Sequence, residues 1–217
     1  MEKVCGKCFL KRFAAGAVVA AAGLAAAPAH AQTIVDEWAT VKVPPAPELK
    51  SVTVEPKTTA FLALDLVRQG CNNERRPRCI ASLPKVQKFL AEVRAKGMPV
   101  IYSHYPGVAI ADILKEVAPA AGEPVISALS DKFLNTDLEK ILKDKGIKTV
   151  IVAGTAAHGA VLYTASGAAM RGMQVIVPVD GMSAENTYAE QLTAWQLANA
   201  PAIANRVTLT KFEQIRF

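Results

Sequence analysis

The feature that most constrains the fold is a series of short apolar runs that do not alternate with polar residues. They are TAFLALDL at 59–66, PVIYSH at 99–104, KTVIVAG at 148–154, QVIVPVD at 174–180 and RVTLT at 206–210. A continuous apolar run is typical of a strand that is buried on both faces. We therefore expect five strands inside a sheet that is covered on both sides.

Segments with helical periodicity separate these runs. Residues 83–96 place Val86, Phe89, Leu90 and Val93 on one helical face. Thr136 and Glu139 have the spacing of a capping box, and Gly146 suits the end of the helix that such a box would open. Further helices are predicted at 109–117, 158–171 and 185–199. Strands that alternate with helices predict an α/β fold, a three-layer sandwich with a mainly parallel, doubly wound sheet.

The first 31 residues have the layout of a secretory signal peptide. Four basic residues precede an Ala-rich apolar stretch, and Ala29-His30-Ala31 fits the small-x-small rule for cleavage. An uncleaved anchor is the alternative, although the stretch is short for a spanning helix. We expect an exported protein, periplasmic or secreted, without a membrane anchor after cleavage. Residues 32–57 are predicted to form an extended N-terminal arm, and residues 58–217 the folded domain.

Charge and cysteine content agree with export. Without residues 1–31, Lys plus Arg falls from 25 to 21 and Asp plus Glu from 19 to 18, so the net charge falls from +6 to +3. The one remaining basic cluster, ERRPR at 74–78, is too small to predict a nucleic-acid partner. Cys71 and Cys79 bracket this cluster, and in an oxidising compartment we expect them to form a disulfide.

Several polar residues fall where the predicted strands end, which is where ligands bind in open α/β sheets. They are Asp65, His104, Gly154 with His158, and Asp180. Each has a structural alternative: Asp65 could hold backbone N–H groups, His104 could cap a turn, and His158 could hydrogen-bond the loop at a helix start. Asp180-Gly181 is more typical of a turn than of a catalytic site. Asp65, His104 and His158 could also bind a metal, although their spacing does not require one.

Common cofactor motifs are absent from the sequence. Residues 154–159 have the outline of a phosphate loop, but Ala160-Val161 stands where Lys-Ser/Thr would follow, and no G-x-G-x-x-G follows a strand. We therefore expect neither a cofactor nor a metal.

Two stretches resemble the isochorismatase-like (cysteine hydrolase) family: TAFLALDLVRQG, and residues 132–184 from KFLNTDL to DGMSA. The resemblance covers residues 58–210 and implies a parallel sheet flanked by helices. In the amidase branch it implies an Asp that deprotonates a Cys at the start of the helix after the glycine loop, an assisting Lys, and loop N–H groups that bind the oxyanion. It also implies a homo-oligomer.

The chain departs from this pattern at two positions. Asp65 matches the acid, but the nucleophile position is Ala160 and the Lys position is Ser127. The sequence therefore predicts a divergent member without the catalytic Cys and Lys. Lys132 is displaced by five residues, and whether it reaches the pocket stays open. A thiol-dependent amidase is not expected, because alanine cannot form an acyl-enzyme.

The isochorismatase branch of the family works without that cysteine. It cleaves a vinyl ether, and the resemblance implies that a carboxylic acid protonates the enol carbon before water adds. An Asp whose pKa is raised by an apolar pocket could do this alone. Ala157-His158 and the turn at 102–107 are similar to that branch.

We therefore expect a hydrolase of a small organic substrate, with Asp65 as general acid or base. His104, His158 and Thr155 would contact substrate or water, and the N–H groups of Gly159 and Ala160 would bind developing negative charge.

Arg68 could pair with a substrate carboxylate, or it could be solvated or paired with Glu74. The alternative function is a catalytically silent member that binds a small molecule or forms part of an oligomer. Lys132 separates these possibilities, because contact with Asp65 would preserve a modified catalytic pair.

Overall fold

The computed structural model describes residues 33–217, and the predicted signal peptide lies outside them. The chain divides into two compact units, with the boundary between Val43 and Pro44. In the described part of the first unit, α1 (Ile34–Glu37) is followed by a 3₁₀ turn at Trp38–Thr40, so the predicted arm is helical here instead of extended. Within residues 33–217, no helix combines the length and hydrophobicity needed to span a membrane.

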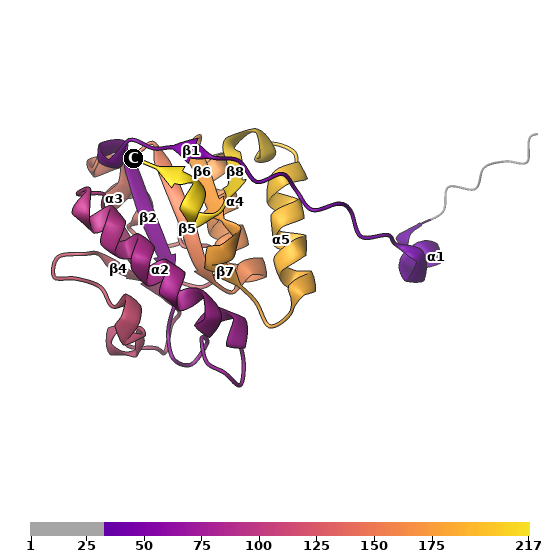
Figure 1. Ribbon diagram of the computed structural model, residues 1–217, viewed down its shortest axis with the longest axis horizontal. Coiled ribbons are helices and arrows are strands. Elements are labelled where there is room, and N and C mark those ends of the chain that lie inside the picture. The colour runs from indigo at the N-terminus through magenta and orange to yellow at the C-terminus, as the bar shows by residue number, and fades with distance from the viewer. Residues whose placement is uncertain (1–32) are drawn as a thin grey trace, which may run out of the picture. The chain divides into compact units, whose positions relative to one another are not determined.

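The second unit contains a parallel sheet with the strand order β4-β3-β2-β5-β6-β8 (Figure 1). Its strands are β2 (Thr59–Leu64), β3 (Val100–His104), β4 (Val125–Ser127), β5 (Thr149–Thr155), β6 (Gln174–Pro178) and β8 (Val207–Thr210). A short strand, β7 (Met182–Ser183), extends the end of β5, and β1 (Val52–Thr53) pairs separately with β9 (Ile215–Arg216). The predicted strands and the doubly wound parallel sheet are confirmed.

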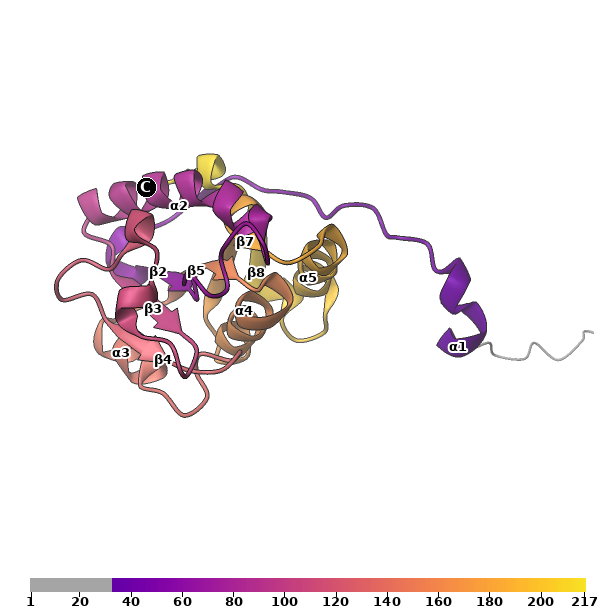
Figure 2. The same cartoon turned by 90° about the horizontal axis from the view of Figure 1, so that it is seen from below.

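Helices cover both faces of this sheet, as Figure 2 shows with α2 above it and α3 and α4 below it. The helices are α2 (Pro77–Ala95), α3 (Leu138–Asp144), α4 (Leu162–Met170) and α5 (Thr187–Asn199). Alternate residues of β2 point to opposite faces: Leu62 joins the core beneath α3, α4 and α5, and Phe61 joins the core beneath α2. Two hydrophobic cores therefore clamp one buried sheet, which is the predicted three-layer arrangement.

The predicted helix at 109–117 is wrong. The segment contains two 3₁₀ turns, at Ile110–Asp112 and Lys115–Val117. Its backbone pairs with the loop after β2 instead, since Arg68 N donates to Asp112 O and Leu114 N donates to Leu66 O. A long-range backbone pairing has replaced the local helix.

Three helix starts also differ from the prediction. Helix α2 begins at Pro77, because proline suits the first turn of a helix. The N-cap of α3 is Asp137 and not Thr136, although the Thr136 hydroxyl accepts from Leu138 N at 3.2 Å and donates to Lys132 O. Before α4, residues Ala157–Val161 form a π-helical turn.

Candidate active site

The reversal of strand order places a crevice between the carboxyl ends of β2 and β5. Gly154 allows the two strands to approach there: its φ is +133°, and a Cβ at this position would lie 2.0 Å from the carbonyl oxygen of Leu64. Asp65 follows β2 with a left-handed φ of 53°. The backbone at both strand ends is therefore shaped around this crevice.

Lys132 reaches Asp65. Its Nζ lies 2.8 Å from Asp65 Oδ2 and donates to the carbonyl oxygens of Ala128, at 3.0 Å, and Leu129, at 2.7 Å. Its side chain has no exposed surface, and that of Asp65 is 9% exposed. Ser103 Oγ donates to the other carboxylate oxygen at 2.7 Å. A buried acid and a buried base thus share one short contact at the end of the sheet.

Burial shifts both groups of this pair toward their neutral forms. Desolvation raises the pKa of Asp65 above 3.8, against the opposing effects of Lys132, Ser103 and His104. Desolvation likewise lowers the pKa of Lys132 below 10.5, against the attraction of Asp65. The pKa values of Asp65 and Lys132 therefore lie closer to each other than in water. Such a pair is suited to exchanging protons with a substrate.

The lysine comes from a different backbone position than the family pattern implies. Ser127, the matching position, ends β4 and is exposed. The loop after β4 turns back, and its buried Lys132 delivers an ammonium group to Asp65. The family position carries no lysine, and the question left open for Lys132 is answered by its contact with Asp65.

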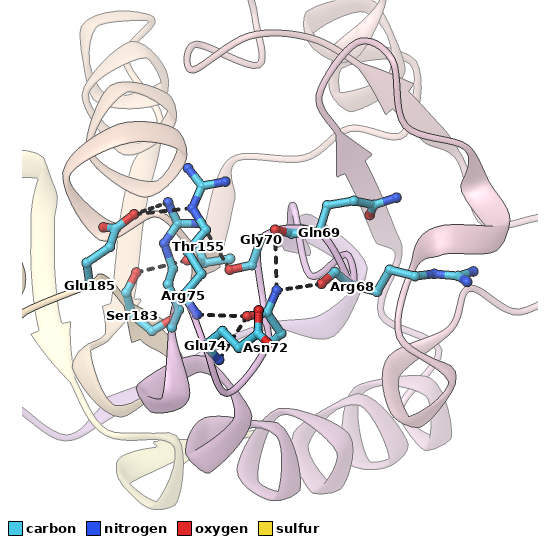
Figure 3. A network of polar contacts seen from close by, with 10 residues as sticks. Arg68, Gln69, Gly70, Asn72, Glu74, Arg75, Thr155, Ser183 and Glu185 are labelled. Carbon is cyan, nitrogen blue, oxygen red and sulfur yellow. Dashed lines mark hydrogen bonds and ion pairs between the residues drawn. The ribbon is translucent and has the colours of Figure 1, made fainter.

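The glycine loop forms the other side of the site. Ala160 is 4% exposed, and with Gly159, Thr155 and Asp65 it lines a pocket of about 310 Å³. The Thr155 hydroxyl donates to Ser183 O at 3.1 Å (Figure 3). Gly159 N donates to the carbonyl oxygen of Ala156 at 3.0 Å, so the N–H predicted to bind negative charge is engaged within its own turn. No side chain in the pocket lining can act as a thiol nucleophile.

The two histidines lie beside the pocket, not in its lining. His104 is half-buried, and its Nδ1 lies 3.1 Å from the carbonyl oxygen of Tyr105. His158 is exposed on the π-helical turn. Within residues 33–217, no three His, Cys, Asp or Glu side chains are placed to hold a metal, so Asp65 and these histidines do not converge on one.

Arg68 is directed away from the site. Its Nε lies 2.9 Å from Asp112 Oδ1, and its Nη2 donates to Ala111 O. The predicted pairing with a substrate carboxylate is therefore not supported, and neither is the alternative pairing with Glu74.

Two arginines that the sequence motifs do not indicate also line the pocket: Arg75 and Arg76. They belong to the ERRPR run, which by composition alone is typical of a solvated surface. The disulfide between Cys71 and Cys79, with a Cα–Cα distance of 5.3 Å, closes the loop that carries them and confirms the predicted pairing. The signal that could have found them is the position of this closed loop directly after Asp65.

Comparison with known proteins gives consistent relatives. Residues 59–210 match the family described as the isochorismatase domain. The chain is 31% identical over 113 residues to the secreted isochorismatase effector Isc1 of Verticillium dahliae, covering 47% of this chain and 60% of that protein. It is 32% identical over 124 residues to an N-carbamoylsarcosine amidase from Arthrobacter, covering 44% of this chain and 47% of that protein. The chain thus spans about half the length of these curated relatives.

Solved structures show the same fold at lower identity. An isochorismatase family protein from Desulfovibrio vulgaris superposes with a TM-score of 0.65 at 20% identity, covering 72% of this chain and 95% of that one. A cysteine hydrolase from Pseudomonas syringae also gives a TM-score of 0.65, at 18% identity, covering 77% of this chain and 95% of that one.

Proposed function

The chain belongs to the isochorismatase domain family, and on that premise we propose that it hydrolyses a small organic substrate without a cysteine nucleophile. The observation that carries the proposal is the 2.8 Å contact between Lys132 and Asp65 at the pocket where Ala160 replaces the nucleophile. An acid–base pair is in place, and the group that would form a covalent intermediate is missing.

The chemistry that suits this arrangement is acid-catalysed hydration of a vinyl ether. Asp65, whose pKa burial raises, donates a proton from its acid form to the enol carbon and so generates an oxocarbenium ion. Water adds to this ion and returns a proton to the Asp65 carboxylate, and the hemiketal collapses to a carbonyl compound and an alcohol. Lys132 sets the proton affinity of Asp65 throughout. No step requires a bond between enzyme and substrate.

Two further observations support the reaction class and the location. One relative carries the name of a secreted isochorismatase. The disulfide between Cys71 and Cys79 is of the kind that persists in oxidising compartments, so we also propose that the protein is exported, to the periplasm or the medium. The homo-oligomer stays a prediction, for which light scattering of the purified protein is the direct measurement.

The test is turnover of a substrate panel: isochorismate, simple amides, esters and small imides. We expect turnover of isochorismate, and a loss of at least about 100-fold in Asp65→Asn, because general acid–base catalysis contributes on that scale. Asp144→Asn is the matched control, since Asp144 is exposed and paired with Lys140 on α3.

Equal turnover in wild type and Asp65→Asn would remove Asp65 from the mechanism. Binding of a panel compound without turnover would instead favour the alternative function, a catalytically silent small-molecule-binding protein.

A further inference from the structure

One wall of the pocket is cationic, and its charges are unevenly balanced. Arg75 and Arg76 line it, and both come from the loop that the disulfide closes. Arg76 is 7% exposed; it donates to Gly70 O and forms a close ion pair with Glu185, which lies between β7 and α5. Glu185 therefore compensates Arg76.

Arg75 shares this carboxylate at longer range and has no other ion-pair partner among residues 33–217. Its Nε is 3.8 Å from Glu185 Oε1, beyond hydrogen-bond distance, and its side chain is 55% exposed (Figure 3). Lys132 compensates Asp65, and Glu185 already binds Arg76. The pocket is thus left with about one uncompensated positive charge, on Arg75.

One hydrogen-bond donor of the wall is unpaired within residues 33–217. Arg76 Nε is buried without a hydrogen-bond partner among the described residues. A guanidinium group presents its donors as a planar fork that matches a carboxylate. The Glu185 carboxylate is hydrogen-bonded to Arg76 and lies 3.8 Å from Arg75, so one carboxylate is already placed near both guanidinium groups.

From this geometry we propose that Arg75 determines the specificity of this pocket: it binds a carboxylate group of the substrate, in competition with Glu185. Arg76 is a positioning residue that holds Glu185 and the loop. The inference rests on the proposed function only in taking this pocket as the substrate pocket. It assigns specificity to a loop that carries none of the proposed acid–base groups.

The experiment measures binding, independently of turnover. Benzoate and pyruvate are compared with their neutral isosteres, benzamide and pyruvamide, by calorimetry or ligand-observed NMR on the purified oxidised protein. We expect each carboxylate to bind at least about 10-fold more tightly than its amide, a factor that corresponds to about 1.4 kcal/mol. The difference should shrink as salt screens the exposed Arg75.

Variants of three residues locate the effect. Arg75→Gln should weaken carboxylate binding about 10-fold and leave amide binding unchanged, whereas Arg75→Lys should lose less because it keeps the charge. Glu185→Gln should strengthen carboxylate binding, because the competing carboxylate is gone while its amide oxygen can still accept from Arg76. Arg78→Gln is the matched control, because Arg78 pairs with Glu190 and lies outside this pocket's lining.

The inference is overturned if carboxylates and amides bind equally, if no carboxylate binds at about 50 mM, or if Arg75→Gln and Arg78→Gln behave alike. Carboxylate binding that depends on Arg75, without turnover of any substrate, would overturn the proposed function alone. Turnover of a neutral substrate that Arg75→Gln leaves unchanged would overturn this inference alone.

Discussion

Replacing Lys132 with methionine tests whether the buried pair at the site is a coupled unit. The substitution keeps much of the volume of the side chain but leaves the Asp65 carboxylate buried without its cation. Removing one partner of a buried ion pair costs about 3–5 kcal/mol. Asp65 can escape part of this cost by taking up a proton. That uptake costs about 4 kcal/mol at pH 7 for a carboxyl with an ordinary pKa of 3.8, at 1.36 kcal/mol per pH unit.

The same escape gives the destabilisation a definite pH dependence. In the folded variant the pKa of Asp65 is raised further, so between pH 3.8 and that value the folded state binds more protons than the unfolded state. Stability therefore falls as the pH rises through this window. We expect Lys132→Met to lower the free energy of unfolding by about 3–4 kcal/mol at pH 7, and by about 2–3 kcal/mol less at pH 5.

The assay is urea unfolding followed by circular dichroism, with a double-mutant cycle. Asp65→Asn together with Lys132→Met should be more stable than the sum of the single losses implies, because the double variant buries no charge. Lys140→Met is the control: its partner Asp144 is exposed, and such pairs contribute about 0–1 kcal/mol. Additive losses, or a loss that is equal at pH 5 and pH 7, would refute the coupling of Lys132 with Asp65.

Three other outcomes follow from the site. The value of kcat/KM should fall as the pH rises through the pKa of Asp65, which burial raises above 3.8, because only the protonated carboxyl can donate a proton to the substrate, as a pH series would measure. Ala160→Cys should introduce a thiol beside this pair that reacts with iodoacetamide, as mass spectrometry would detect, and should raise turnover of simple amides; an inert thiol would contradict the assigned nucleophile position. Gly154→Ala should cost at least about 4 kcal/mol or prevent folding, because the added Cβ would lie 2.0 Å from Leu64 O; a cooperative melt at the wild-type temperature would contradict this.

Much of the fold could be predicted because most of its strands have a recognisable local sequence pattern. Runs such as TAFLAL at 59–64 are apolar on both faces, which only a fully covered sheet explains. Strands β4 and β7 were not predicted, since two or three residues carry no usable periodicity. The helix predicted at 109–117 failed because the segment's backbone bonds to residues far away in the sequence, which a local pattern cannot register.

Some residues of the candidate site could likewise be predicted from the sequence, and others could not. Asp65 was predictable, because a carboxylate directly after a buried strand must lie at the ligand-binding edge of the sheet. The approach of Lys132 was not, since it depends on how the loop after β4 turns back toward β2. Arg75 and Arg76 were not predicted because a run of charged residues is typical of a solvated surface. Only the structure shows that the closed loop places them in the pocket lining.

We expect the arginine wall of this site to take its final position only when the disulfide forms. Asp65 and Lys132 lie outside the segment between Cys71 and Cys79, whereas the arginine wall belongs to that segment. A newly made, reduced chain would therefore form the acid–base pair before the arginine wall that is proposed to select carboxylates. Protein prepared in a reducing cytoplasm should handle neutral compounds as well as the oxidised form does, and should discriminate poorly in favour of carboxylates until the two thiols are oxidised.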